Sequence, residues 1–122
     1  MIKIEELIIK KCEKCGNTVR VLNNTNTITC CGEEMKVLEP LYEENNVHVP
    51  NAIKKDRSLY ITVDHVMEED HYISKIYILR YNEVIEYNFT PEDEIAFAFP
   101  YSEEMKVYAL CNKHGLWEGK IK

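Results

Sequence analysis

The sequence predicts an all-β protein in two parts, a small metal-bound domain followed by an antiparallel β-sandwich. Three observations support this fold class. Four of the five cysteines fall within the first 31 residues, in two close pairs. The later part of the chain consists of short runs rich in Ile, Val, Tyr and Phe, which turn or polar residues separate at spacings of about ten. No stretch of this chain shows the period of a long amphipathic helix.

The composition indicates a soluble protein of one domain, or of a normal domain plus a very small one. Of the 122 residues, 45% are hydrophobic, which is enough for a core. The net charge of −6 argues against nucleic acid as a partner, because phosphate binding needs a basic face. Neither the start of the chain nor any later run is apolar enough for a signal peptide or a membrane span. The sequence therefore predicts a cytoplasmic protein with reduced thiols and no membrane partner.

The first four cysteines, Cys12, Cys15, Cys30 and Cys31, have the spacing of a metal site. They occur in KCEKCG and TCCGEEM, so a Cys-x2-Cys pair and an adjacent pair are each followed by glycine. Tight turns of this kind direct backbone amides at the sulfurs, and four thiolates imply tetrahedral zinc or iron. Neighbouring side chains normally diverge, so the adjacent pair is expected to strain the local backbone. Buried structural thiols or a redox-active Cys-x2-Cys are the alternative interpretation.

The segment between the two cysteine pairs predicts a short hairpin. Residues 19–22 and 27–29 are expected to pair across an Asn-Asn-Thr-Asn turn. So small a unit cannot bury much apolar surface, so it needs a bound metal to stabilise its fold. Pro40 and a polar run follow it, which predicts a small metal-bound domain at residues 1–38 and a β-sandwich at residues 39–122.

Six strands are predicted in the second part of the chain. β-branched and aromatic residues fill the runs, and apolar alternation is clearest in residues 95–99 and 107–110. Short strands in this number and spacing are typical of a sandwich. The predicted runs are residues 58–65, 71–81, 83–90, 94–100, 105–111 and 116–122.

The four histidines lie where predicted strands begin or end. His65 follows one strand, His71 begins the next, and His114 comes three residues after Cys111, which ends a third. His48 precedes Val-Pro, which favours an extended backbone. Any one of these histidines alone would be an ordinary surface or core residue. Together with Cys111 they could bring four imidazoles and a thiolate to one metal, a mixture that favours a redox-active transition metal over a structural zinc.

The motifs KCEKCG, TCCGEEM, HVP, HVMEEDHYI and CNKHGLW occur in this order along nearly the whole chain. As a set they resemble desulfoferrodoxin, the two-iron class of superoxide reductase. The resemblance implies a desulforedoxin-like N-terminal domain and an immunoglobulin-like sandwich. It also implies two mononuclear irons. The ligands of the first would be Cys12, Cys15, Cys30 and Cys31, and those of the second, reactive iron would be His48, His65, His71, His114 and the axial Cys111.

The resemblance implies the one-electron reduction of superoxide to hydrogen peroxide, with iron(II) as the electron source and the five ligands of the reactive iron as the catalytic residues. Superoxide would enter opposite the axial thiolate, and a rubredoxin-like donor would restore iron(II). A homodimer is expected, as is common in the family. Trp117, which follows the last motif, would either shield the thiolate or pack in the core.

One position departs from the family pattern. The family usually has Glu-Lys before the first histidine, whereas this chain has Asn46-Val47. The glutamate caps the oxidised iron and the lysine attracts superoxide, so this chain lacks both. Lys54 or Lys55 could replace the cation, although a solvated pair in a loop is the simpler interpretation. Two alternatives therefore stay open: an iron-binding electron-transfer protein with weak or no superoxide turnover, and a zinc-loaded structural module.

Overall fold

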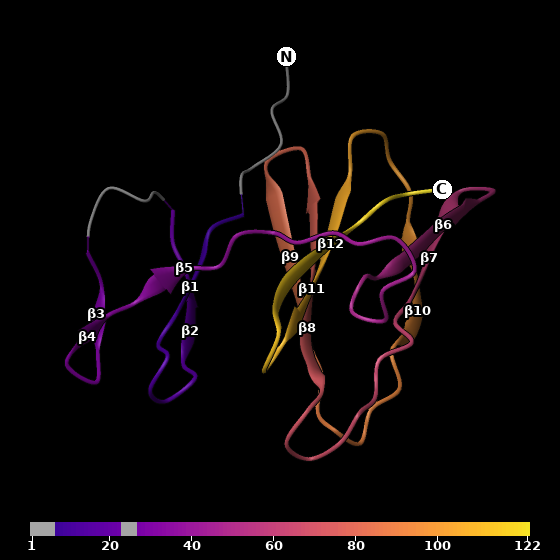
Figure 1. The fold of residues 1–122 in the computed structure, drawn as a ribbon. Helices are drawn as coiled ribbons and strands as arrows, with labels where there is room; N and C mark the ends of the chain where they lie inside the picture. The colour runs from indigo at the N-terminus through magenta and orange to yellow at the C-terminus, as the bar shows by residue number, and fades with distance from the viewer. Residues whose placement is uncertain (1–6, 23–26) are drawn as a thin grey trace. The chain divides into compact units, whose positions relative to one another are not determined.

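The computed structural model describes residues 7–22 and 27–122, and these residues contain strands, turns and irregular segments but no helix (Figure 1). The predicted all-β fold class is therefore confirmed. The chain divides into two compact units, with the described residues 7–39 in one and residues 40–122 in the other. No helix capable of crossing a membrane occurs in these described stretches.

The smaller unit consists of two short antiparallel sheets. The first has the order β2 (Thr18–Arg20), β1 (Ile9–Lys11) and β5 (Lys36–Val37), and the second pairs β3 (Thr29–Cys30) with β4 (Glu33–Glu34). Strands of two or three residues form few hydrogen bonds and cover little apolar surface. The buried apolar side chains of this unit include Leu7, Ile9 and Met35. So small a core needs a further constraint, such as a metal.

The strands of this unit do not pair as the sequence predicts. Residues 19–22 and 27–29 were expected to form one hairpin, but β2 pairs with β1 and β3 pairs with β4. The predicted turn itself lies outside the described residues. The physical reason lies in the glycines: Gly16 and Gly32 have φ values of +79° and +78°, which glycine adopts without steric cost. Each cysteine pair, rather than the Asn-Thr run, therefore forms the turn of a hairpin.

The larger unit is a sandwich of two antiparallel sheets (Figure 1). A three-stranded sheet has the order β10-β7-β6, and a four-stranded sheet has the order β12-β11-β8-β9. This is the immunoglobulin-like sandwich that the sequence predicts. In chain order the strands are β6 (Asn51–Lys55), β7 (Ser58–Thr62), β8 (Ile73–Arg80), β9 (Glu83–Asn88), β10 (Ala96–Pro100), β11 (Lys106–Cys111) and β12 (Gly115–Gly119).

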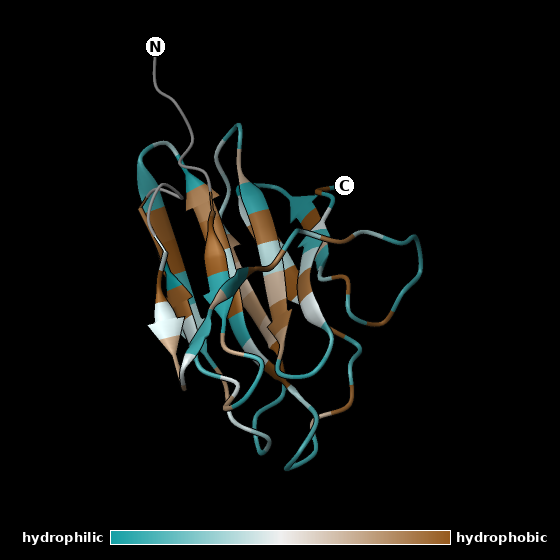
Figure 2. Cartoon of the chain, turned by 60° about the vertical axis from the view of Figure 1, so that its left-hand side comes forward, coloured by the Kyte–Doolittle hydropathy of each residue, from teal (hydrophilic) through white to brown (hydrophobic). Residues whose placement is uncertain are grey.

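Aliphatic side chains from facing strands form the core of this unit. Leu59 and Ile61 of β7 are fully buried, as are Ile76 and Ile78 of β8 and Val107 of β11. Figure 2 shows hydrophobic residues concentrated along the strands and hydrophilic residues in the connecting loops. Burying each such aliphatic side chain contributes about 1.5–3 kcal/mol. The sandwich therefore has a core that does not depend on a metal.

Each of the six predicted runs overlaps one observed strand, β7 to β12, but β6 was not predicted. Its sequence, NAIKK, has a polar first residue and two lysines, so it resembles a loop. In the structure β6 is the edge strand of its sheet, and only Ala52 is buried. Its backbone bonds to β7 on one side and, through the Lys54 amide and the Ala52 carbonyl oxygen, to Lys122 on the other. Backbone hydrogen bonds therefore hold this strand without an apolar pattern.

A β-bulge interrupts the pairing of β8 with β11. Leu110 pairs with Lys75, whereas Cys111 pairs with Ile73, so Ser74 is an extra residue on β8. The Ser74 hydroxyl donates a hydrogen bond to the Leu110 carbonyl oxygen at 3.3 Å. Bulges change the direction of nearby side chains. This one lies immediately before the position of Cys111.

The last residue of β12 passes unusually close to the segment that precedes β6. A Cβ atom at Gly119 would lie 2.5 Å from the Pro50 carbonyl oxygen and 2.8 Å from Pro50 Cγ. No side chain fits there unless the Pro50 backbone moves. Because His48 lies two residues before Pro50, this contact also limits where His48 can lie.

We therefore predict that Gly119→Ala destabilises the larger unit by about 1–3 kcal/mol, the usual cost of overpacking. Urea unfolding followed by the fluorescence of Trp117, the single tryptophan of the chain, measures this effect. Lys106→Ala, at an exposed position of β11, is the control and is expected to change stability by less than about 0.5 kcal/mol. Equal effects of the two substitutions would contradict the importance of the close contact.

Candidate metal centres

The structure gathers all of the predicted site residues into two groups. Within each group, the possible ligand atoms lie within 4.8 Å of one another. Thus residues that are far apart in the sequence meet in space in the two combinations that the motifs suggested. One group comprises Cys12, Cys15, Cys30 and Cys31, and the other comprises His48, His65, His71, Cys111 and His114.

Tight turns hold the cysteines of the first group. Cys12 follows β1, and its carbonyl oxygen accepts a hydrogen bond from the Gly16 amide at 2.9 Å. Cys30 ends β3, and Cys31 then has a φ of +54°. This left-handed conformation is unfavourable for a residue that has a Cβ atom. The backbone strain expected at the adjacent pair therefore falls on Cys31.

The sulfur atoms have the spacing of a tetrahedral metal site. Cys15 Sγ lies 3.7 Å from Cys30 Sγ, and Cys30 Sγ lies 3.8 Å from Cys31 Sγ. Four sulfurs at about 2.3 Å from one metal would be about 3.8 Å from each other. The four cysteines therefore fit a single thiophilic metal ion.

The thiols of this group differ in acidity. A backbone hydrogen bond from Cys15 lowers the pKa of Cys12 to about 7. Hydrogen bonding with the Cys15 side chain raises the pKa of Cys31 to about 12. Cys12 therefore ionises more readily than Cys31. A bound cation favours the thiolate form of all four cysteines.

The second group comes from the ends of strands that meet at one end of the sandwich. His65 follows β7, His71 precedes β8, Cys111 ends β11, and His114 lies in the turn before β12. His48 precedes β6, in a turn that the Val49 amide closes by a 3.1 Å hydrogen bond to the Asn46 carbonyl oxygen. His48 is thus not extended as predicted, because a proline restrains mainly the residue directly before it, here Val49.

The four imidazole rings form a closed square. In the order His48, His65, His71, His114, successive ring centroids are 4.6, 4.5, 4.7 and 5.0 Å apart. The diagonal from His48 to His71 is longer, at 6.2 Å. The ring nitrogens face inward: His114 Nδ1 lies 3.1 Å from His48 Nε2 and 3.0 Å from His71 Nε2. Adjacent nitrogens at about 2.1 Å from one metal would be about 3.0 Å apart.

The sulfur of Cys111 lies beside two of these nitrogens. Its Sγ is 3.6 Å from His65 Nε2 and 3.8 Å from His114 Nδ1, which belong to opposite corners of the square. Cys111 is only 1% exposed. The four nitrogens and the sulfur all lie within 4.8 Å of one another and fit a single metal ion.

Comparison with known proteins identifies the family. A model of the family described as Desulfoferrodoxin matches residues 42–120, and a model described as Desulfoferrodoxin, N-terminal domain, matches residues 5–38. The chain belongs to the desulfoferrodoxin family. The Desulfoferrodoxin of Syntrophotalea carbinolica is 34% identical, covering 95% of this chain and 98% of the relative. The Desulfoferrodoxin homolog of Archaeoglobus fulgidus is also 34% identical, with coverages of 93% and 97%.

A solved structure supports the fold. The crystal structure of the superoxide reductase from Treponema pallidum matches with a TM-score of 0.76 and covers 95% of this chain and 99% of that chain, at 17% identity. The resemblance to desulfoferrodoxin that the motifs indicate is therefore confirmed by the family models. The two groups match the two iron centres of this family, so the cofactors are two mononuclear irons.

Outward hydrogen bonds fix the orientation of two histidines in this desulfoferrodoxin-type site. His48 Nδ1 donates to Asn46 Oδ1 at 2.8 Å, and His65 Nδ1 donates to the Val66 carbonyl oxygen at 2.6 Å. Both partners accept, so the hydrogen is on Nδ1 in each ring. The lone pair is then on Nε2, which is the nitrogen that faces the group. Such outer partners set the tautomer of a metal-binding histidine.

Two further residues support the ligands: Asn112, which the sequence did not identify, and Trp117, for which the sequence left either shielding of the thiolate or packing in the core open. The Asn112 side chain accepts from the Tyr72 amide at 2.9 Å and donates to the Asp70 carbonyl oxygen at 3.0 Å, and so it holds the backbone on both sides of His71. Trp117 Nε1 donates to the His114 carbonyl oxygen at 2.8 Å, and its ring stacks on His48 at 4.8 Å. Trp117 thus contacts two ligands, in addition to packing in the core.

Burial favours the neutral form of two of the imidazoles. Removal from water lowers the pKa of His48 to about 4, and repulsion by neighbouring histidines acts in the same direction. Burial likewise lowers the pKa of His65. A neutral imidazole is the form that binds a metal. These two rings are therefore ready to bind a metal without first losing protons at neutral pH.

The two lysines considered as substitutes for the missing cation lie elsewhere. Lys54 and Lys55 are in β6 rather than in a loop, and they pair with Leu59 and Ser58 at the start of β7, whereas His65 lies beyond its other end. Lys54 Nζ also lies 4.6 Å from the Tyr101 ring centroid. A different lysine lies next to two of the predicted ligands in the sequence.

That cation is Lys113, which lies between Cys111 and His114. Its Nζ is 3.8 Å from a carboxylate oxygen of Asp70, the residue before His71. The sequence signal was present, since Lys113 is in the CNKHGLW motif, but its charge could not be assigned to the site without the geometry.

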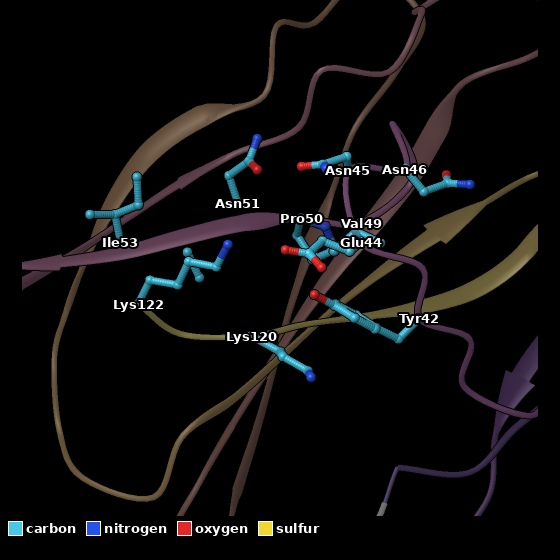
Figure 3. A pocket seen from close by; sticks show the side chains of 11 residues that line it. Tyr42, Glu44, Asn45, Asn46, Val49, Pro50, Asn51, Ile53, Lys120 and Lys122 are labelled. Carbon is cyan, nitrogen blue, oxygen red and sulfur yellow. The ribbon is translucent and has the colours of Figure 1, made fainter.

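A cavity of about 160 Å³ lies beside the turn that carries His48 (Figure 3). Residues of segment 42–53 line it together with Lys120 and Lys122. Lys120 Nζ lies 4.4 Å from the Tyr42 ring centroid. The cavity has no histidine or cysteine in its lining, so it is not part of the metal centre, but Asn46 lines it.

We predict that the metal-free larger unit loses stability as the pH falls from about 6.5 to about 4. The unfolded chain binds a proton at His48 near pH 6.5, whereas the folded chain binds it only near pH 4, so protons favour unfolding in this interval. Urea midpoints at pH 7, 5.5 and 4.5, followed by Trp117 fluorescence, measure the loss. His48→Gln should flatten the profile. The same profile in both proteins would contradict the lowered pKa.

Proposed function

We propose that this protein is a superoxide reductase, which reduces superoxide to hydrogen peroxide at the group of four histidines and Cys111. The observation that carries the proposal is the square of inward-facing nitrogens with a sulfur on one side. Among the described residues, no further histidine, cysteine or carboxylate belongs to this group. The five residues would hold a metal with one ligand fewer than six, which would leave room on the metal for a small substrate. Membership of the desulfoferrodoxin family supports an oxidoreductase of this class.

In the proposed reaction, superoxide takes up one electron and two protons to give hydrogen peroxide, and iron bound at the site supplies the electron. His48, His65, His71, His114 and Cys111 would hold the iron. The Cys111 thiolate would increase electron density at the iron, as axial thiolates do in haem proteins. Burial of Cys111 keeps water away from the sulfur, while the exposed His114 leaves a route by which water can deliver protons.

We further infer that residues 1–38 form a desulforedoxin-like iron domain with Cys12, Cys15, Cys30 and Cys31 as ligands, and that residues 39–122 form the reductase domain. The sulfur spacing and the match of the N-terminal family model support this division. A rubredoxin-like electron donor, a homodimer and a cytoplasmic location are part of the same proposal. The donor and the homodimer follow from the family resemblance.

An iron-binding electron-transfer protein with weak superoxide turnover is the second candidate. The observation that favours it is Val47, which takes the place of the family's lysine, carries no charge and is 52% exposed. The chain also has a net charge of −6, which repels an anionic substrate. The rate of reaction with superoxide distinguishes the two candidates.

Substitutions of single cysteines are expected to separate the two centres. Cys111→Ser replaces a thiolate with a weak neutral donor, so it should abolish superoxide reduction and the thiolate-to-iron absorption band of the reactive site. Cys30→Ser should remove the bands of the four-cysteine centre and leave turnover with an artificial reductant. Pulse radiolysis and visible spectra of iron-loaded protein measure both. Wild-type turnover in Cys111→Ser, or zinc in both centres after growth with ample iron, would contradict the proposal.

Charges next to the site are expected to change the association rate with superoxide in opposite directions. A unit charge about 8 Å from an anion contributes about 2 kcal/mol at an effective dielectric of 20, which salt and solvent reduce to a several-fold effect on rate. Lys113→Gln should therefore be several-fold slower and Asp70→Asn several-fold faster, and both differences should shrink at high ionic strength. Lys54→Gln is the control. Equal rates in all the proteins would mean that Lys113 does not attract the substrate.

A further inference from the structure

The side chain of Asn46 forms its hydrogen bonds within the turn that carries His48. Its Oδ1 accepts hydrogen bonds from the His48 backbone amide at 2.9 Å and from His48 Nδ1 at 2.8 Å. Its Nδ2 lies 3.4 Å from a carboxylate oxygen of Glu43. Both acceptor sites of the oxygen are therefore used, and both are used on the same histidine.

This pair of bonds restrains His48 in two ways. The hydrogen bond to the backbone amide fixes the position of the His48 backbone. The hydrogen bond to the ring fixes the rotation of the imidazole. The ring bond also requires the hydrogen on Nδ1, so that Nε2, which lies 3.1 Å from His114 Nδ1, presents its lone pair to the group. Trp117 stacks on the ring at an interplanar angle of 15°. This ring contact does not determine which of the two nitrogens carries the hydrogen.

His48 differs from His65 in the kind of group that holds it. A backbone carbonyl oxygen, that of Val66, accepts from the His65 ring, whereas a side chain accepts from the His48 ring. A side chain can change by mutation while a carbonyl oxygen cannot. Of these two ligands, His48 is thus the one whose electronic properties the chain can adjust by a single substitution.

We propose that Asn46 is a positioning residue of the reactive centre: it selects the Nδ1–H tautomer of His48, orients its ring, and sets how strongly His48 donates to the metal. The inference rests on the proposed role of His48 as an iron ligand. It gives Asn46 a function different from capping the metal, because an oxygen that already accepts two hydrogen bonds from His48 is turned toward that residue.

Three substitutions test the proposal in the iron-loaded full chain. Asn46→Ala removes the acceptor, and loss of such an outer partner typically costs 10–100-fold in metal affinity. Asn46→Asp keeps an acceptor of the same shape and adds charge, so it should keep most of the affinity and lower the reduction potential of the reactive iron. Asn45→Gly is the control, since Asn45 adjoins Asn46 and lines the same cavity, and its φ of +66° suits glycine.

Iron affinity is measured by competition with a chelator under reducing conditions, and the potential is measured by spectroscopic titration. The four-cysteine centre in the same molecule is the internal standard, and its bands should be unchanged throughout. Equal loss in Asn46→Ala and Asn45→Gly, or equal loss in Asn46→Ala and Asn46→Asp, would overturn the proposal. Full iron retention in His48→Ala would instead refute the ligand role of His48, which separates failure of the proposed site from failure of this inference.

Discussion

Five electron-rich atoms lie within 4.8 Å of one another at one end of the sandwich, and the larger unit is organised around this crowding. Nitrogen lone pairs 3.0 Å apart repel unless a cation or a proton lies between them. Hydrogen bonds on the outer side of His48 and His65, to Asn46 and to the Val66 carbonyl oxygen, keep the hydrogens of these two rings out of the group. Their Nε2 lone pairs therefore face inward, where a metal ion can accept them.

The two centres bring their ligand atoms together in different ways. The cysteine group is local, because two tight turns bring four sulfurs together at the cost of an unfavourable φ at Cys31. The histidine group is assembled by the sandwich, whose buried core holds the strand ends in place. Metal removal should therefore affect the smaller unit more, since its folding free energy includes the binding free energy of the metal.

The sequence revealed the site residues better than their surroundings. Thiols and imidazoles are rare enough that their spacing identifies them, and β-rich runs identified β7 to β12. Pairing in the smaller unit was predicted wrongly, because turn preference was assigned to the Asn-Thr run rather than to Gly16 and Gly32. The roles of Asn46 and Asn112 could not be predicted, because an asparagine has no distinctive pattern and its contacts depend on the tertiary fold. The same holds for the pairing of Lys113 with Asp70.

The bulge at Ser74 limits how the length of this chain can change during evolution. His71 and Cys111 lie on the site side of the bulge, so a one-residue deletion or insertion between His71 and Ser74 would reverse the faces of β8 relative to His71. The turn between β8 and β9, which includes Tyr81, lies at the far end of the same strand and carries no ligand. We therefore expect changes in chain length to be tolerated at the β8–β9 turn but not at the end of β8 that lies beside the metal ligands.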